Sequence, residues 1–256
     1  MNKVKLTIPF LLMFCMAINA GAQVKKQEVK KTVKKTQVKK TQVKKTQVKK
    51  MTTSATTTPA GVIPGTRVKI TTDSGVMVLR LYDQTPKHRD NFIKLANNHF
   101  FDSLLFHRVM QGFMIQGGDP LSKNATPGSL LGNGDVGYTI PAEFDTSLFH
   151  KKGALAAART NNPEKASSGC QFYIVEGKKY SDAELDGMEM QTGIKFSPAK
   201  RNIYKTMGGT PFLDMNYTVF GEMETGFDVL DKIAAARGDG SNRPLTDIRM
   251  KVELMK

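Results

Sequence analysis

The stretch FHRVMQGFMIQGGD, residues 106–119, combines one permanently charged side chain with apolar and amide neighbours. In a strand, every second side chain points to the same face, so Phe106 and Arg108 are expected to share one face, as are Met114 and Gln116. A single cation beside an apolar floor suits a neutral, partly apolar ligand better than a phosphate or a metal ion. The alternative interpretation is a buried hairpin whose arginine forms a salt bridge.

Short apolar or alternating runs, separated by turn residues, surround this stretch and are typical of strands. Two further segments, one opening at Thr85-Pro86 and one running from Thr225 to Arg237, predict amphipathic helices. Many short strands with two capping helices favour a mainly β fold, a closed antiparallel barrel without exposed strand edges. Besides two strands within 106–119, strands are expected at 67–72, 76–82, 153–159, 171–175, 217–222 and 248–254.

The folded domain is expected to run from residue 66 to residue 256, which is long enough for one sizeable core. Cys170 is the only cysteine beyond the first 22 residues, so an intrachain disulfide is excluded once those residues are removed. Burial of apolar side chains must therefore stabilise the domain, which is expected to be a monomer.

Residues 1–22 are predicted to be a secretory signal peptide. Lys3 and Lys5 precede an apolar run, and the small residues Ala20-Gly21-Ala22 end it. A lipoprotein signal at Cys15 is the alternative, but Phe14 stands where lipid attachment needs a small residue. The sequence thus predicts an exported protein, with the periplasm as the expected location and envelope association or secretion as alternatives.

Residues 23–50 repeat the unit VKKTQ and contain twelve lysines and one glutamate. They account for about +11 of the chain's formal charge of +15, so the basic character belongs to this tail rather than to the domain. Such a composition predicts a disordered segment that could bind a polyanionic envelope surface; a solubilising spacer is the alternative. Nucleic acid is not expected as a partner after export. Residues 51–65 are a Thr/Pro/Gly linker.

Several motifs for other chemistries fail in their context. The glycines at 132, 134 and 137 match a dinucleotide-binding string, but Pro141 blocks the helix that must follow it. The motif GxSxG is absent, and Cys170 is expected to be a small core residue.

No metal site and no cofactor are expected, because the four histidines show no ligand spacing with one another or with Cys170. His107 should face the other side of its strand from Arg108 and is expected to be a packed or hydrogen-bonded residue.

Four ordered stretches resemble the cyclophilin-type peptidyl-prolyl cis-trans isomerases. They are residues 106–119, GALAAAR at 153–159, SGCQFYI at 168–174 and FLDMNYTVFG at 212–221. The resemblance implies a closed eight-stranded barrel capped by two helices, with a packed interior and a ligand groove on the outside.

The resemblance also implies the site residues. Arg108 matches the catalytic arginine of the family, and Gln116 matches the amide that holds the substrate backbone. Phe212, Tyr173 and Tyr217 stand where many members have Trp, Phe and His, which puts cyclosporin affinity in doubt. The substrate-binding residues expected from the matched positions are Phe113, Met114, Gln116, Ala158, Arg159, Gln171, Tyr173, Phe212, Leu213 and Tyr217.

Residues 176–210 are longer than the corresponding part of compact members and are interpreted as a helical insertion that could cover one rim of the groove. Ser181 and Glu184 form a predicted capping box within it, and Ser197-Pro198 opens a second helix.

The function implied by the resemblance is acceleration of X-Pro bond rotation in exported proteins, which assists their folding. Its partners would be proline-containing unfolded or flexible polypeptides. Two alternatives are a binding module that holds such segments without relevant turnover, and an envelope-anchoring protein that acts through its lysine tail.

Overall fold

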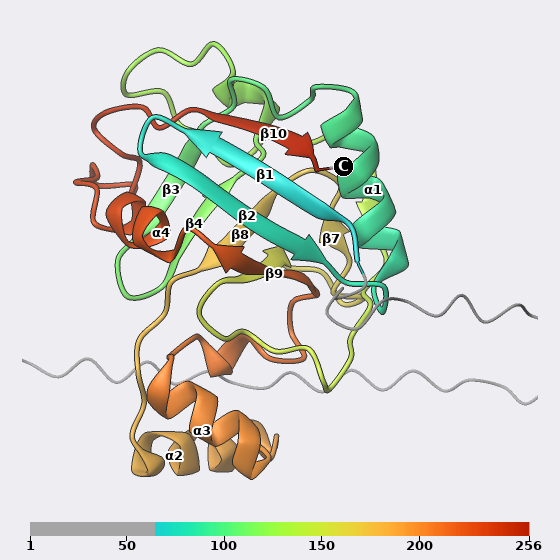
Figure 1. Cartoon of the computed structure of the whole chain (residues 1–256), viewed down its shortest axis with the longest axis vertical. Coiled ribbons are helices and arrows are strands. Elements are labelled where there is room, and N and C mark those ends of the chain that lie inside the picture. The colour runs from blue at the N-terminus through green and yellow to red at the C-terminus, as the bar shows by residue number, and fades with distance from the viewer. Residues whose placement is uncertain (1–64, 256) are drawn as a thin grey trace, which may run out of the picture. The chain divides into compact units, whose positions relative to one another are not determined.

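The computed structural model describes residues 65–255 (Figure 1). The predicted signal peptide, the lysine-rich repeat and all but the last residue of the linker lie outside the described residues. No helix in the described range is long and apolar enough to cross a membrane.

Eight antiparallel strands form one strongly curled sheet in the order β10-β1-β2-β9-β6-β8-β4-β3. The hairpin expected around Gly75 is present. Its strands β1 and β2 are antiparallel, with Arg67 opposite Arg80 at one end and Thr72 opposite Gly75 at the other. A separate ladder joins β5 (Thr139–Ile140) and β7 (Ser167–Ser168). The eight strands of the main sheet are β1 Arg67–Thr72, β2 Gly75–Leu81, β3 Phe106–Met110, β4 Met114–Gly117, β6 Ala154–Ala157, β8 Phe172–Val175, β9 Val219–Thr225 and β10 Met250–Leu254.

The prediction of a closed barrel is wrong: the sheet is a half-barrel whose edge strands, β3 and β10, form no ladder with each other. One isolated bridge, Leu105 to Arg249, spans the gap, and the Phe106 amide donates to the Ile248 carbonyl at 2.9 Å. The regular strand begins at Met250 rather than at Ile248, so too few residues face β3 for pairing to propagate.

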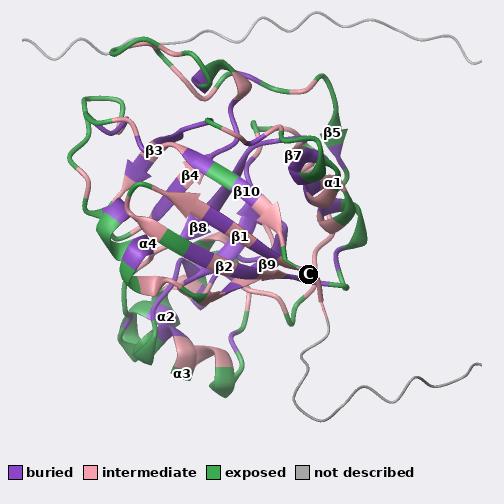
Figure 2. Ribbon diagram, turned by 45° about the horizontal axis from the view of Figure 1, so that its top comes forward, coloured by how far each residue is buried: buried purple, intermediate pink, exposed green. Residues whose placement is uncertain are grey.

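The concave side of the sheet holds the core. Alternate residues of the strands point into this core, among them Val68 and Ile70 of β1. Figure 2 colours buried parts of the strands purple. Phe92, Phe101 and Phe172 pack against one another at centroid distances of 4.8–5.5 Å. Full burial of each such ring contributes about 1.5–3 kcal/mol, which explains how a domain without a disulfide holds together.

Two helices pack on the sheet, as expected: α1 (Pro86–Asn97) and α4 (Phe227–Ala234). Thr85, expected to cap α1, makes no side-chain hydrogen bond there. The carboxylate of Glu143 caps the helix instead, because it accepts from the amides of Lys87 (3.1 Å) and His88 (3.0 Å).

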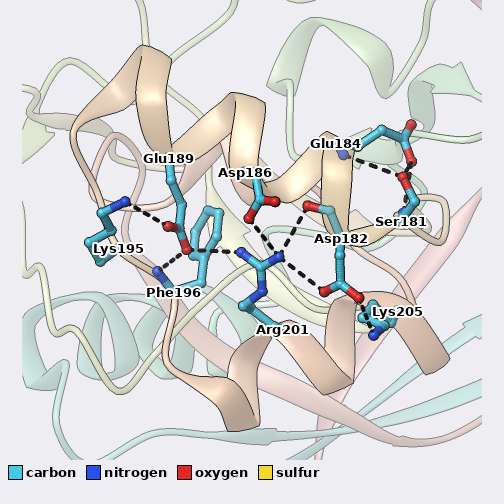
Figure 3. Close-up of polar contacts among 9 residues, drawn as sticks. All are labelled: Ser181, Asp182, Glu184, Asp186, Glu189, Lys195, Phe196, Arg201 and Lys205. Carbon is cyan, nitrogen blue, oxygen red and sulfur yellow. Dashed lines mark hydrogen bonds and ion pairs between the residues drawn. The ribbon is translucent and has the colours of Figure 1, made fainter.

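Two more helices, α2 (Asp182–Thr192) and α3 (Pro198–Thr206), occupy the segment 176–210 and project from the sheet (Figure 1). The capping box of Ser181 and Glu184 is present. Figure 3 shows the contact between the helices, where Arg201 pairs with Asp182, Asp186 and Glu189. A small aromatic core of its own, Tyr180, Leu185, Phe196 and Tyr204, holds this segment together.

Candidate active site

A β-bulge decides which residues of β3 face outward. The β3–β4 register shifts between Phe106 and Arg108, so these two residues do not share a face. Phe106 is fully buried in the core, whereas Arg108 and Met110 are half-buried on the convex side. The sequence expectation for Phe106 was therefore wrong, because strict alternation does not survive a bulge. The expectation for Met114 and Gln116, on β4, is confirmed.

The convex face carries a cavity of about 100 Å³. Nine of the eleven predicted site residues line it, although they come from β3, β4, β8, a short 3-10 helix and three loops. The lining residues are Arg108, Phe113, Met114, Gln116, Ala158, Arg159, Tyr173, Leu213 and Tyr217. No residue of α2 or α3 is among them, so these helices do not form a wall of the cavity.

Arg108 supplies the cavity with a cation. Its Nη1 donates to Gln116 Oε1 at 3.2 Å and its Nη2 to Met110 Sδ at 3.2 Å, while Cζ lies 5.9 Å from the ring centroid of Phe113. Among the described residues no carboxylate pairs with Arg108. The alternative interpretation of residues 106–119, a buried hairpin whose arginine forms a salt bridge, is therefore wrong for this part of the chain. The guanidinium charge is therefore held in place but not neutralised.

Gln171 orients Gln116 rather than lining the cavity. Its Nε2 donates to the carbonyls of Gly132 (3.0 Å) and Gly134 (2.7 Å), so its Oε1 must face Gln116 Nε2, 3.0 Å away. Gln116 Oε1 is then left to accept from Arg108. Gln171 also lines a neighbouring cavity of about 170 Å³ together with Ala158 and Arg159, so its expected contact with a bound peptide stays a prediction. The glycine-rich loop that resembled a dinucleotide motif supplies the two carbonyls.

Phe212 lies at the rim. Its ring is 42% exposed and tilts against Phe113 at a centroid distance of 5.8 Å. Arg159 Cζ lies 4.7 Å from the ring centroid of Tyr217, and Arg159 Nε donates to the Asn216 carbonyl at 3.0 Å. The rim thus presents aromatic faces and a second cation to an extended ligand.

The floor of the cavity includes a polar network that sequence reasoning missed. The hydroxyl of Tyr173 lies 3.0 Å from Nε2 of His150. Burial raises the pKa of Tyr173 well above its usual range, so the hydroxyl stays protonated. A tyrosine at a position where the resembling family often has phenylalanine was the one available signal, since a buried hydroxyl needs a partner.

His107 faces away from the cavity, as expected, and is 3% exposed. Neither ring nitrogen has a hydrogen-bond partner of good geometry among the described residues. Burial lowers the pKa of His107 to about 4, and the nearby Arg108 and Arg243 also lower it, against the attraction of Asp119. His107 is therefore neutral at pH 7 and lies behind the arginine rather than beside a ligand.

A Ser-His-Glu arrangement occurs elsewhere in the fold. His88 Nδ1 lies 2.7 Å from Glu143 Oε2, and its Nε2 lies 3.0 Å from Ser167 Oγ. Ser167 is 1% exposed and belongs to the β5–β7 ladder, so a substrate cannot reach its hydroxyl. Burial lowers the pKa of His88. This cluster joins α1 to the loops around it. Within residues 65–255, no group of three or more His, Cys, Asp or Glu side chains is arranged to hold a metal ion.

Comparisons with known proteins agree with this geometry. The family described as cyclophilin type peptidyl-prolyl cis-trans isomerase/CLD matches residues 67–253. A Staphylococcus haemolyticus protein whose assigned name is peptidyl-prolyl cis-trans isomerase is 33% identical over 183 residues, covering 71% of this chain and 87% of that protein. A Streptococcus pyogenes protein assigned as a bifunctional phosphatase/peptidyl-prolyl cis-trans isomerase is 37% identical over 189 residues, 72% of this chain but 37% of that protein. The chain thus spans just over a third of that streptococcal relative.

The fold is similar to that of a solved cyclophilin type peptidyl-prolyl cis-trans isomerase from Cryptosporidium parvum. The TM-score is 0.56 at 23% identity, covering 75% of this chain and 99% of that chain. A second structure of that protein, obtained in the presence of the dipeptide Ala-Pro, gives a TM-score of 0.54 at 23% identity, covering 74% of this chain and 99% of that chain.

Proposed function

The chain belongs to the cyclophilin-type peptidyl-prolyl cis-trans isomerase family, and from this premise we propose that it accelerates X-Pro bond rotation in exported proteins and so assists their folding. Its ligands are proline-containing segments of unfolded or flexible chains. The observation that carries the proposal is an arginine that has no carboxylate partner within residues 65–255 and is held by an oriented glutamine beside a cavity with apolar side chains in its wall.

The chemistry needs no nucleophile, acid or metal, because no bond is made or broken. Rotation about the amide must overcome a resonance barrier of roughly 18–20 kcal/mol, and without catalysis it takes tens to hundreds of seconds. An enzyme lowers the barrier by binding the twisted amide better than the planar one. In the twisted state the imide nitrogen becomes pyramidal and regains a lone pair, to which Arg108 can donate. Arginine suits this role because its charge does not titrate.

The remaining cavity residues divide the substrate into a fixed and a rotating part. Phe113, Met114 and Leu213 offer apolar surface for the proline ring, which would act as the pivot. Gln116 can hydrogen-bond the substrate backbone on one side, so rotation takes place on the other. Because Gln171 fixes the orientation of Gln116, this contact is preorganised and costs little ordering on binding.

The test is a protease-coupled assay on an X-Pro tetrapeptide with the wild type and Arg108→Ala. Loss of one preorganised donor should lower kcat/KM roughly 100-fold or more. Arg89→Ala is the matched control: it removes an arginine of α1 that pairs with Asp83 and Asp90, and should keep wild-type turnover. Near-normal isomerisation by folded Arg108→Ala would refute the role of Arg108. Wild-type protein that only prevents aggregation of an unfolded client, without turnover, would favour the binding-module alternative.

Export and envelope contact are further parts of the proposal, and they are supported by the composition of residues 1–50. Cell fractionation should find the protein in the envelope fraction and without residues 1–22. Deleting residues 24–50 should reduce retention on anionic envelope material. If the deleted and full-length proteins fractionate alike, the lysine tail does not act as a tether.

A further inference from the structure

We propose that the helical segment 176–210 positions the wall of the proline cavity through a buried hydrogen-bond chain that starts at Tyr204, which makes Tyr204 a positioning residue for isomerisation. The proposal rests on the function proposed above. None of the residues 176–210 lines the cavity, so any influence of the segment on the cavity must pass through contacts behind the wall.

The chain consists of four side chains. The hydroxyl of Tyr204, on α3, lies 2.8 Å from Oδ2 of Asp214. Asp214 Oδ1 lies 2.9 Å from both the backbone amide and Nδ1 of His150. His150 Nε2 lies 3.0 Å from the hydroxyl of Tyr173, which lines the cavity. An unbroken path thus leads from the inserted helix to the cavity floor.

The chemistry of the partners gives every hydrogen bond a direction. The Asp214 carboxylate only accepts, so the Tyr204 hydroxyl donates to it and the His150 proton must lie on Nδ1. In an imidazole that carries this single proton, Nε2 is an acceptor and the Tyr173 hydroxyl donates to it. Each polar side-chain group of the path has a partner, and such fully satisfied networks restrict the positions of their members.

Burial makes this path stiff. Tyr204 and His150 are fully buried, and Tyr173 and Asp214 are 4% and 3% exposed. The ring of Tyr204 packs edge-on against three aromatic rings. Phe196 and Tyr180 belong to the segment 176–210, and Phe149 lies outside it. Water cannot replace a lost hydroxyl partner in this buried place. When one hydrogen bond of the path is removed, the remaining side chains must therefore shift to avoid an unpaired polar group.

Two wall residues depend on the path. The ring of Tyr173 runs nearly parallel to that of His150, with an interplanar angle of 11°. Leu213 is the chain neighbour of Asp214 and ends the short 3-10 helix η2 (Pro211–Leu213). Holding the Asp214 carboxylate therefore also holds the Leu213 side of the cavity.

The base of the segment provides a second attachment. The amides of Glu176 and Gly177 both donate to the Phe113 carbonyl at 3.0 Å. Gly209, at the other end, bridges to Lys178, while the Thr210 amide donates to the His150 carbonyl at 2.8 Å. The segment is thus fastened to the cavity wall at Phe113 and, behind the wall, to His150 of the hydrogen-bond chain.

The experiment is a double-mutant cycle on the full-length chain with Tyr204→Phe and Tyr173→Phe, each of which removes one hydroxyl and keeps the ring. Tyr204→Phe should lower kcat/KM about three- to ten-fold, a size usual for coupling through a packed network. In the Tyr173→Phe background the same change should have less than about a two-fold effect, because the path is already cut. Tyr180→Phe removes a hydroxyl outside the path from the same aromatic core and is the matched control.

The outcome separates positioning from simple stability. A merely structural Tyr204 would lower the unfolding temperature and have the same effect on kcat/KM in both backgrounds, which would overturn the proposal. No change in kcat/KM for Tyr204→Phe would also overturn it. In the wild type, imidazole nitrogen NMR should show the His150 proton on Nδ1. A proton on Nε2 alone would contradict the path whether or not the variants fold.

Failure of the proposed function gives a different result. If the wild type shows no turnover, the cycle is read from the Kd of an Ala-Pro-containing tetrapeptide, measured by NMR titration. The same non-additivity in binding would support the positioning role without catalysis, and additive or absent effects would refute it.

Discussion

Lowering the pH from 7 to 4 is expected to destabilise the fold through His107, the buried histidine directly behind Arg108. The fold disfavours the imidazolium because burial strips its hydration, two arginines repel it and neither ring nitrogen has a hydrogen-bond partner of good geometry within residues 65–255. Asp119 attracts the proton but does not offset these effects. The unfolded chain leaves the same imidazole in water.

The sign and the size of the effect follow from proton binding. The pKa of His107 falls from 6.5 to about 4 on folding, so between these values the unfolded chain binds more protons than the folded one. The free energy of unfolding therefore decreases as the pH falls through this window. At about 1.4 kcal/mol for each pKa unit, the loss approaches 3 kcal/mol, a large part of a typical stability of about 5–15 kcal/mol.

The assay is urea unfolding followed by circular dichroism at pH 7, 5.5 and 4, on the wild type and on His107→Gln. The readout is the change of unfolding free energy with pH, so any constant cost of the substitution cancels. The variant should lose most of the acid sensitivity but keep a remainder, because burial lowers the pKa of His88 as well. His99→Gln removes an exposed histidine and serves as the control. Equal pH slopes for the wild type and His107→Gln would refute the reasoning.

Three further outcomes are expected. Gln171→Ala removes the donor to the carbonyls of Gly132 and Gly134, of which Gly134 is buried, and frees Gln116, so kcat/KM should fall about ten-fold and the unfolding free energy by about 1–3 kcal/mol in urea titrations. Gly209→Ala would place its methyl group 2.2 Å from the His150 carbonyl oxygen, so urea titration should show a loss of about 2 kcal/mol or more, whereas Gly187→Ala, on an open helix face, should be neutral or stabilising. Incubation with EDTA should leave the isomerisation rate unchanged, because amide rotation needs no Lewis acid, and an inactivated protein would contradict the mechanism.

Local patterns in the sequence predicted much of the fold because they report on neighbours along the chain. Alternation identified β1 and β2, and the Ser181–Glu184 spacing identified the start of α2. The site followed from side-chain chemistry together with matched motifs: nine of the eleven predicted residues line one cavity. Arg108 and its apolar neighbours by themselves indicated only a neutral, partly apolar ligand; the resemblance implied that Arg108 acts as a fixed donor in amide rotation.

Tertiary structure alone decided what depends on residues far apart in the sequence. Strict alternation placed Phe106 beside Arg108, but the bulge in the β3–β4 pairing turns Phe106 into the core. The helix α1 is capped by Glu143, a residue no sequence pattern around Thr85 could indicate.

The open edge between β3 and β10 is likewise a property of the whole sheet, because closure requires both edge segments to be in strand conformation at the same place. The hydrogen-bond chain from Tyr204 to Tyr173 connects two hydroxyls. Their positions in the sequence do not indicate that they lie near each other in space. Sequence patterns determined which side chains form the cavity. Long-range hydrogen bonds, which exist only once the chain has folded, decided which residues support them.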